Sequence, residues 1–169
     1  SHGIGRCCSI FGPRDPGSTL HYWLRSVHTK DELACPGSGT DPIQFIDCRD
    51  IASWVVDSVE KRENGIHNLT GPTLQFSEFI SLCRSATNSS CRLTWMDGEF
   101  IYANDIEAFT EMPLWFPEKE DPGFFRIDSS KARRKGFVTR NPKETIRDAW
   151  TWYLSAFFKD TLFPLNGFG

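Results

Sequence analysis

Two titratable side chains in this sequence could do acid–base chemistry, and His21 is the first of them. It stands beside Tyr22 and Trp23 in a segment that predicts a helix from Ser18 or Thr19 to about His28. Because imidazole titrates near neutral pH, His21 could act as a general acid or base. The alternative is a half-exposed histidine on a helix with no catalytic role, and the sequence favours that plainer interpretation.

The second candidate is Asp47, at the end of a short apolar segment that predicts a buried strand. Ligands of open α/β sheets bind beyond the carboxyl ends of the strands, so Asp47 is a candidate catalytic carboxylate. A hydrogen bond at the start of the following helix is an equally good explanation. Arg49 could pair with a carboxylate or enolate of a substrate, although a surface salt bridge is the plainer interpretation.

The helix after Asp47 has a clear apolar pattern. Asp50 is predicted to be its N-cap, because a carboxylate can accept the free N–H groups of the first turn. Small apolar residues then recur at helical spacing and predict the face that packs on the core, and the residues on that face are Ile51, Ala52, Val55, Val56 and Val59.

Aromatic residues are abundant, with 14 Phe and 6 Trp. Such a content requires a sizeable core, a partner surface or an apolar pocket. We predict a pocket lined by segments 11–23 and 111–118, which suits a small, rather apolar substrate. For Trp115 and Phe116 the alternative is packing against the last helix. The predicted substrate-binding residues are Phe11, Tyr22, Trp23, Arg49, Trp115 and Phe116.

Composition excludes several classes of function. The net charge is −3 and the charges are interspersed, which argues against nucleic acid as a partner. No apolar run is long enough for a bilayer, and residues 1–20 do not form a signal peptide, so we expect a cytoplasmic protein without membrane contact. The six cysteines are irregularly spaced, which favours free thiols over disulfides or a zinc site.

Predicted strands and helices alternate along the chain, which indicates an α/β fold with parallel strand pairing. The strands are expected at about 5–11, 33–36, 44–47, 65–71, 91–95 and 124–127. The helices are expected at about 19–28, 50–63, from 73, 97–106 and 131–135, and a last one is capped by Asn141 with Pro142 in its first turn. We expect one domain over residues 1–160 and a flexible tail over 161–169.

Five motifs occur in an order that resembles a known family. They are RCCSIFGP (6–13), QFIDCRDIASWVV (44–56), GIHNLTGP (65–72), PLWFPE (113–118) and FRIDS (125–129). Together they resemble the C-terminal half of an extended or atypical short-chain dehydrogenase/reductase of the NAD-dependent epimerase/dehydratase type. The resemblance runs from about residue 4 to about residue 158. It implies the remnant of a doubly wound parallel sheet together with the small substrate-binding lobe.

In that family an N-terminal Rossmann half holds the nucleotide and carries a Tyr-x-x-x-Lys catalytic pair. The present chain has no glycine-rich dinucleotide loop, and none of its three tyrosines is followed by lysine four residues later. The resemblance therefore implies that this chain alone binds no cofactor, and that NAD(P) enters only if a Rossmann half is supplied.

Two departures from the family pattern affect the expected substrate. The usual Arg-Pro-Gly beside the nicotinamide reads Arg6–Cys7–Cys8 here, which weakens any cofactor contact. Ile43 stands where sugar-nucleotide members carry an arginine, which disfavours a nucleotide-sugar substrate.

These observations leave two classes of function open. The first is an enzyme acting on a small molecule, either by cofactor-free cyclisation, isomerisation or elimination or as the substrate-binding part of an NAD(P)-dependent oxidoreductase. The second is a non-catalytic binding subunit or an obligate dimer. An exposed sheet edge, which the missing half would leave, could be covered by a partner chain or by a second copy.

Overall fold

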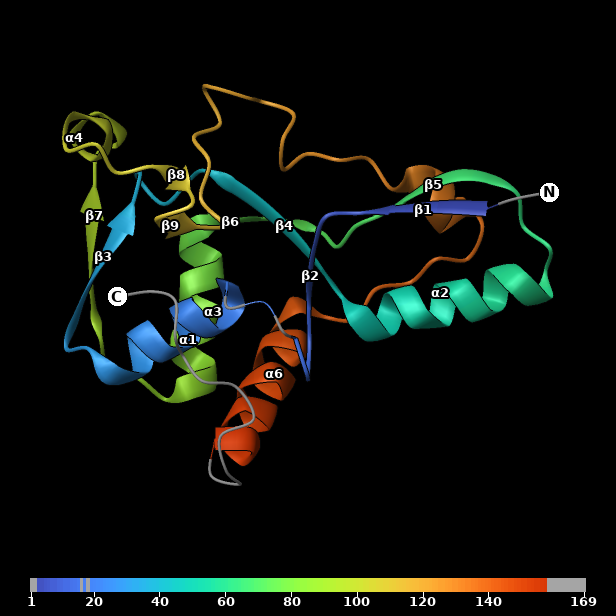
Figure 1. Cartoon of the computed structure of the whole chain (residues 1–169), viewed down its shortest axis with the longest axis horizontal. Helices are drawn as coiled ribbons and strands as arrows, with labels where there is room; N and C mark the ends of the chain where they lie inside the picture. Colours follow the sequence, from blue (N-terminus) through green and yellow to red (C-terminus); the bar gives the residue numbers. More distant parts are fainter. Residues whose placement is uncertain (1–2, 16, 18, 158–169) are drawn as a thin grey trace.

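The computed structural model describes residues 3–15, 17 and 19–157. The elements form two groups connected by β4 (Pro42–Asp47). The larger group contains three helices that pack together, and the smaller group forms an extended arm of two strands and two helices (Figure 1). Within the described residues, no helix is both long and apolar enough to cross a bilayer.

The larger group is built around α1 (Thr19–Thr29), α3 (Phe76–Thr87) and α6 (Pro142–Phe157). In α1 the buried apolar residues recur at helical spacing, and they are Leu20, Trp23, Leu24 and Val27. This stripe enters one continuous core with Phe76, Phe79 and Ile80 of α3. The helical packing therefore follows directly from the apolar pattern of the sequence.

Three small sheets line this core. β2 (Ser9–Phe11) pairs in parallel with β4, and β6 (Thr73–Gln75) pairs with β4 in the antiparallel sense. β3 (Glu32–Pro36) and β7 (Arg92–Met96) form a separate parallel pair. α4 (Gly98–Ala103) follows β7 directly, and β8 (Ala108–Phe109) then pairs with β9 (Met112–Pro113).

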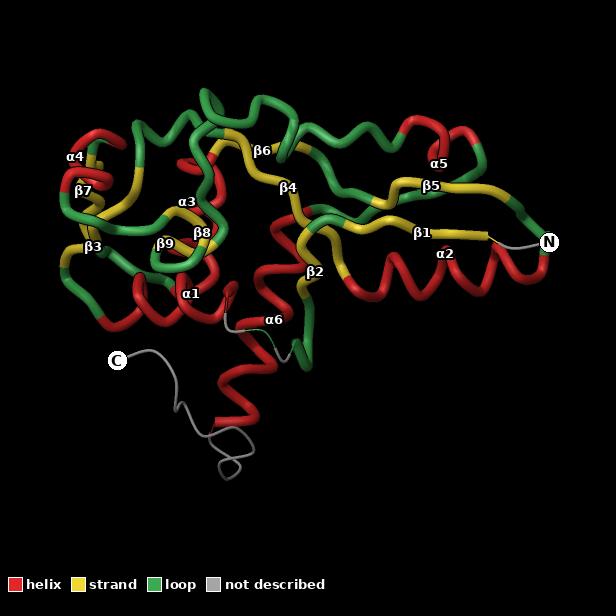
Figure 2. Tube along the Cα trace, turned by 45° about the horizontal axis from the view of Figure 1, so that its top comes forward, coloured by secondary structure: helices red, strands yellow, loops and turns green. Residues whose placement is uncertain are grey.

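The arm consists of β1 (Gly3–Cys7), β5 (Gly65–Leu69), α2 (Cys48–Glu60) and α5 (Ser130–Arg134). β1 and β5 form a two-stranded parallel sheet, and α2 lies along it (Figure 2). A second, smaller core joins this sheet to the two helices and to the end of β4. Its buried members are Ile46, Trp54, Leu69, Ala132 and Phe137.

The predicted α/β class and the parallel pairing are confirmed, as are the helix at α1, the strands at β3 and β7, and the cap of α6. At that cap the Asn141 Oδ1 atom accepts the N–H of Lys143 at 2.9 Å. The predicted tail over 161–169 lies outside the described residues.

Three of the predicted strands and helices differ from the structure. The expected strand over 5–11 is two strands, β1 and β2, that pair with different partners and are separated at Cys8. The helix expected from Thr73 begins at Phe76, because residues 73–75 pair with β4 first. The strand expected over 124–127 is absent: Phe124 and Arg126 donate their N–H groups to carbonyls three residues back, as in successive turns.

The start and the buried face of α2 also differ from the prediction. Its N-cap is Asp47, whose carboxylate accepts the Arg49 N–H at 2.8 Å, and Asp50 lies inside the first turn. The predicted core face is wrong as well. Val55, Val56 and Val59 are 52%, 57% and 73% exposed, whereas Trp54 is buried against the arm sheet. No described residue buries the valine face.

Candidate functional site

A cleft opens where the loop after β3, the junction of β7 with α4 and the segment after β9 come together. Its volume is about 440 Å³, a size that accommodates a small organic molecule. We call it the Trp115 cleft. Its lining residues are Gly37, Ser38, Asp41, Trp95, Asp97, Gly98, Trp115, Pro117 and Lys119.

The position of the Trp115 indole is fixed by Asp41. The Nε1–H of Trp115 donates to Oδ2 of Asp41 at 2.8 Å, and the Glu118 N–H donates to Oδ1 at 3.3 Å. Gly37 permits this arrangement, because its φ is +67° and an added Cβ would lie 2.3 Å from Oδ2 of Asp41. One wall of the cleft is therefore preorganised.

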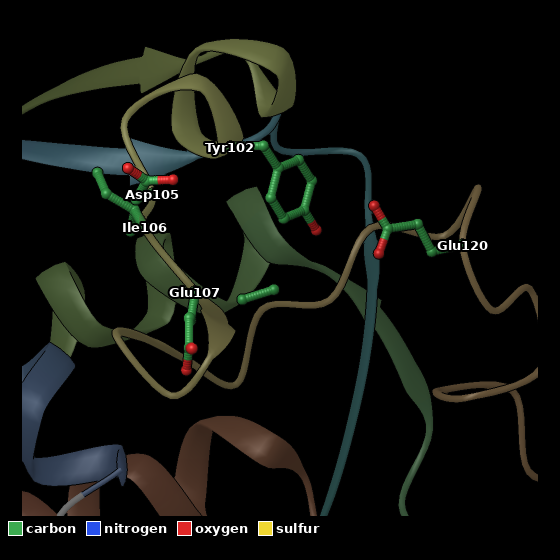
Figure 3. A pocket seen from close by; sticks show the side chains of 6 residues that line it. Tyr102, Asp105, Ile106, Glu107 and Glu120 are labelled. Carbon is green, nitrogen blue, oxygen red and sulfur yellow. The ribbon is translucent and has the colours of Figure 1, made fainter.

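A second hollow of about 500 Å³ lies next to this cleft, and Figure 3 shows its lining. Tyr102 stands between the two, with its ring centroid 6.4 Å from that of Trp115. The Tyr102 hydroxyl points toward the Glu120 carboxylate (Figure 3). Burial and the hydrogen bond to Glu120 raise the pKa of Tyr102 to about 12. The acidic residues Asp105 and Glu107 also line this hollow.

The Tyr102–Glu120 contact can be tested by titration. We expect one of the three tyrosines to ionise near pH 12, and the replacement Glu120→Gln to lower that pKa, since it removes a negative charge beside the phenolate. Ultraviolet difference titration measures this, with Tyr102→Phe identifying the signal and Glu99→Gln as an exposed control on the same helix. An unchanged titration in Glu120→Gln would contradict the contact.

Of the predicted substrate-binding residues, Trp115 lines the cleft. Trp23 and Phe11 lie in the core: the Trp23 Nε1–H donates to the Pro113 carbonyl at 2.7 Å, and the Phe11 ring lies 5.0 Å from that of Phe45. Their burial gives them a packing role in this structure, and their contact with substrate stays a prediction.

The two other predicted aromatic residues are partly buried. Tyr22 packs edge-on against Trp23, with centroids 5.0 Å apart. Phe116 stacks on Phe124 at 5.0 Å. Packing of the Trp115–Phe116 pair against the last helix was the alternative. Trp115 contacts Asp41 and Tyr102, Phe116 contacts Phe124, and both residues belong to or pack on the core that also contains Trp150 of α6.

The predicted catalytic Asp47 and the predicted substrate ligand Arg49 belong to an ion-pair network. Arg49 binds both carboxylate oxygens of Asp47, at 2.9 and 2.7 Å, and reaches Asp148 at 2.8 Å. Arg140 bridges Asp50 at 2.7 Å and Asp47 at 3.7 Å. The network ties the start of α2 to α6, and its internal pairing favours the structural interpretation of both residues.

The charge state of Asp47 agrees with this interpretation. Burial by itself raises the pKa of its carboxyl, but hydrogen bonds from the Arg49 side chain and backbone and from Thr145 outweigh burial, so the pKa lies below its ordinary value. A carboxylate held ionised in this way is a poor proton donor near neutral pH. A catalytic role for Asp47 stays a prediction.

His21, the other predicted catalytic residue, lies between α1 and α6. Its ring is 4.8 Å from that of Tyr153 and 5.9 Å from that of Trp152. Its Nε2 atom is buried without a hydrogen-bond partner among the described residues, and burial lowers the pKa of the ring. A neutral imidazole at this position could accept a proton, but His21 does not line the Trp115 cleft.

Asp41, Asp97 and Tyr102 lie at the site but were not predicted from the sequence. The sequence contains only a weak indication of these residues. Asp41 precedes a proline and Asp97 precedes a glycine, and such pairs are common in ordinary turns and at helix starts. The six cysteines are free thiols: Cys35, Cys83 and Cys91 are buried, Cys8 and Cys48 are partly buried, and Cys7 is exposed. The described residues contain no group of three or more His, Cys, Asp or Glu side chains that could hold a metal ion.

The comparisons with known proteins agree with this fold. The model of the NAD dependent epimerase/dehydratase family matches residues 2–70, which span β1 to β5. No curated protein sequence matches the chain. Solved epimerase and reductase structures share this fold over about 90% of the chain.

Three of those structures illustrate the likeness. The UDP-glucose 4-epimerase of Thermotoga maritima is 16% identical, with a TM-score of 0.64 over 90% of this chain and 46% of that one. The UDP-glucuronic acid 4-epimerase of Bacillus cereus, solved with NAD, is 17% identical, with a TM-score of 0.63 over 90% and 44%. The dTDP-4-dehydrorhamnose reductase of Clostridium acetobutylicum is 16% identical, with a TM-score of 0.65 over 90% and 49%. This chain thus spans less than half the length of each.

Proposed function

We propose that this chain is the substrate-binding part of an NAD(P)-dependent oxidoreductase of the epimerase/dehydratase type. Its substrate is a small, rather apolar molecule held in the Trp115 cleft. The observation that carries the proposal is this cleft, lined by two indole rings, in a chain that has the epimerase fold over 90% of its length. Binding and orientation of the substrate are the tasks of the chain.

The lining of the cleft supports a substrate with an apolar ring. Trp95 and Trp115 both line the cleft with large aromatic rings, which are the usual partners of apolar ligand surface. The Asp41 carboxylate is already bonded to Trp115 and Glu118. Asp97 and Lys119 are exposed and can each bond a polar substituent of the substrate.

The charges disfavour a phosphorylated substrate. Two carboxylates, those of Asp41 and Asp97, line the cleft against the single ammonium of Lys119. Ile43 is fully buried at the position where the resemblance places an arginine in sugar-nucleotide enzymes. Both features support a substrate without a nucleotide diphosphate.

The described residues do not fit a dinucleotide by themselves. A dinucleotide pyrophosphate binds where a strand of a parallel sheet runs through a glycine-rich turn into a helix N-terminus. Here β1 is followed by β2, and β5 is followed by β6. β4 leads into α2 and β7 leads into α4, but the Asp47 and Asp97 carboxylates occupy the N-termini of those helices. β2 precedes α1, but the connecting sequence GPRDPGS (12–18) lacks the G-x-G-x-x-G pattern. The nicotinamide nucleotide, which supplies hydride transfer when bound, must therefore be held by another part of the enzyme.

The cleft can be tested by calorimetry with two small ketones, cyclohexanone and 1-tetralone. We expect saturable binding of 1-tetralone, weakened by about tenfold in Trp95→Ala, because stacking on an indole is worth about 1 kcal/mol or more. The control is Trp152→Ala, which changes a partly buried indole on α6. Equal affinity in the two variants, or no binding of either ketone by the folded protein, would overturn the proposed site.

A further inference from the structure

The second hollow beside the Trp115 cleft has a negatively charged lining. We call it the Tyr102 hollow, and its lining residues are Tyr102, Asp105, Ile106, Glu107, Ala108 and Glu120. Three of these six residues are acidic and none is basic, and Figure 3 shows the carboxylates together with the Tyr102 ring. A hollow lined by charge of one sign raises the local concentration of ions of the opposite sign. The Tyr102 hollow therefore favours a cationic ligand over a neutral or anionic one.

Two of the three carboxylates form no ion pair within the described residues. They are those of Asp105 and Glu107, whereas Glu120 is bonded to the Tyr102 hydroxyl. The ammonium group of Lys119 belongs to the lining of the Trp115 cleft and not to that of the hollow. The negative charge of Asp105 and Glu107 is therefore available to a ligand that enters the hollow.

The Tyr102 ring is a second feature that suits an organic cation. It lines the hollow and is 37% exposed, so a ligand can contact it. An ammonium group close to an aromatic ring is attracted by the negative face of the ring. Within the described residues no group of three acidic, histidine or cysteine side chains could hold a metal ion, whereas carboxylates spread around an aromatic ring suit an organic ammonium ion.

One ligand can reach both cavities. The Tyr102 ring lies 6.4 Å from that of Trp115, which lines the cleft. An extended chain advances about 3.8 Å over three bonds, so a short side chain on a ring in the cleft extends into the hollow. The cleft has the same charge bias, because its two carboxylates, Asp41 and Asp97, are balanced only by Lys119. A cationic side chain therefore meets no repulsive group of the hollow.

We propose that the substrate of this chain is an arylalkylamine, with its ring in the Trp115 cleft and its protonated amine in the Tyr102 hollow. This inference rests on the proposed function and names the substrate class. An alkylamine titrates near pH 10, as lysine does at about 10.4, so it is a cation at neutral pH. The ammonium group pairs with the Asp105 and Glu107 carboxylates and contacts the Tyr102 ring. A neutral ring compound occupies the cleft and gains nothing from the charge of the hollow.

The test compares tryptamine with tryptophol, which share a ring and a chain length and differ in that a hydroxyl replaces the ammonium group. Calorimetry on the full chain should show that tryptamine binds about tenfold more tightly at low ionic strength. Added salt should reduce this advantage, because it screens exposed charges. The double substitution Asp105→Asn/Glu107→Gln should lower the affinity for tryptamine to that for tryptophol and leave tryptophol binding unchanged. Asparagine tolerates the φ of +57° found at position 105.

The matched control is Glu60→Gln/Glu144→Gln, which removes the same two charges at exposed positions outside both cavities and should leave the preference for tryptamine intact. A preference that persists in Asp105→Asn/Glu107→Gln, or that the control variant also loses, would overturn the proposed amine site. Binding of 1-tetralone and tryptophol without an advantage for tryptamine would overturn this inference and leave the proposed function standing. Failure of all three compounds to bind the folded protein would overturn both.

Discussion

Replacing Arg140 by alanine is expected to lower the free energy of unfolding by about 3–5 kcal/mol. The Arg140 guanidinium donates to Asp50 at 2.7 Å and its backbone N–H donates to the same carboxylate at 2.9 Å. The side chain of Asp50 is 7% exposed and that of Asp47 is fully buried. Removing the guanidinium leaves the buried Asp50 carboxylate with the backbone hydrogen bond but without its cation, and urea unfolding measures the cost.

The control for Arg140 is Arg147→Ala. The Arg147 side chain is 60% exposed and contacts Asp148 at the surface of α6, so its removal should cost less than about 1 kcal/mol. Arg140→Lys should recover part of the loss, because the charge remains while the two-point geometry changes. Equal stability of Arg140→Ala and Arg147→Ala would show that the network does not hold α2 against α6.

Replacing Trp23 by alanine is the second change with a large expected effect, a loss of about 3–5 kcal/mol in the free energy of unfolding. Trp23 is fully buried, contacts Phe76 edge-on at 5.2 Å, and donates its Nε1–H to the Pro113 carbonyl at 2.7 Å. Alanine would leave a large cavity and an unpaired carbonyl. Thermal or urea unfolding measures this loss.

Trp23→Phe separates packing from ligand binding. Phenylalanine fills most of the cavity, so this variant should remain folded and bind 1-tetralone in the Trp115 cleft with wild-type affinity. The matched change is Trp152→Phe, at a partly buried indole, which should alter stability less. Normal stability of Trp23→Phe with lost ketone binding would instead support the original prediction that Trp23 contacts the substrate.

The apolar periodicity of the sequence predicted most of the helices, and α1 shows why. Its buried residues follow the helical spacing of its own sequence. They can therefore be predicted without knowing which elements pack against α1. For α2 the same reasoning was wrong about which face is buried. Spacing identified an apolar stripe at Val55, Val56 and Val59, but nothing in the described chain covers it, and Trp54 provides the anchor instead.

The candidate site was less predictable, because its residues are brought together by loops. Asp41, Trp95 and Trp115 lie far apart in the sequence and meet only through the pairing of β3 with β7 and the Asp41–Trp115 hydrogen bond. His21 and Asp47 carried the types of side chain that catalysis uses. Aromatic packing accounts for the surroundings of His21, and an ion-pair network accounts for those of Asp47.

We propose that this chain binds the substrate but has no nucleotide site of its own. Calorimetric titration of the purified chain with NADH and with NADPH tests this most directly, and thermal shift is recorded on the same samples. The proposal predicts no saturable binding of either nucleotide by the folded chain alone, because α2 and α4, the two described helices that directly follow a strand of a parallel pair, have their N-termini occupied by the Asp47 and Asp97 carboxylates. Saturable micromolar binding by the monomer would contradict it and would place a nucleotide site within this chain.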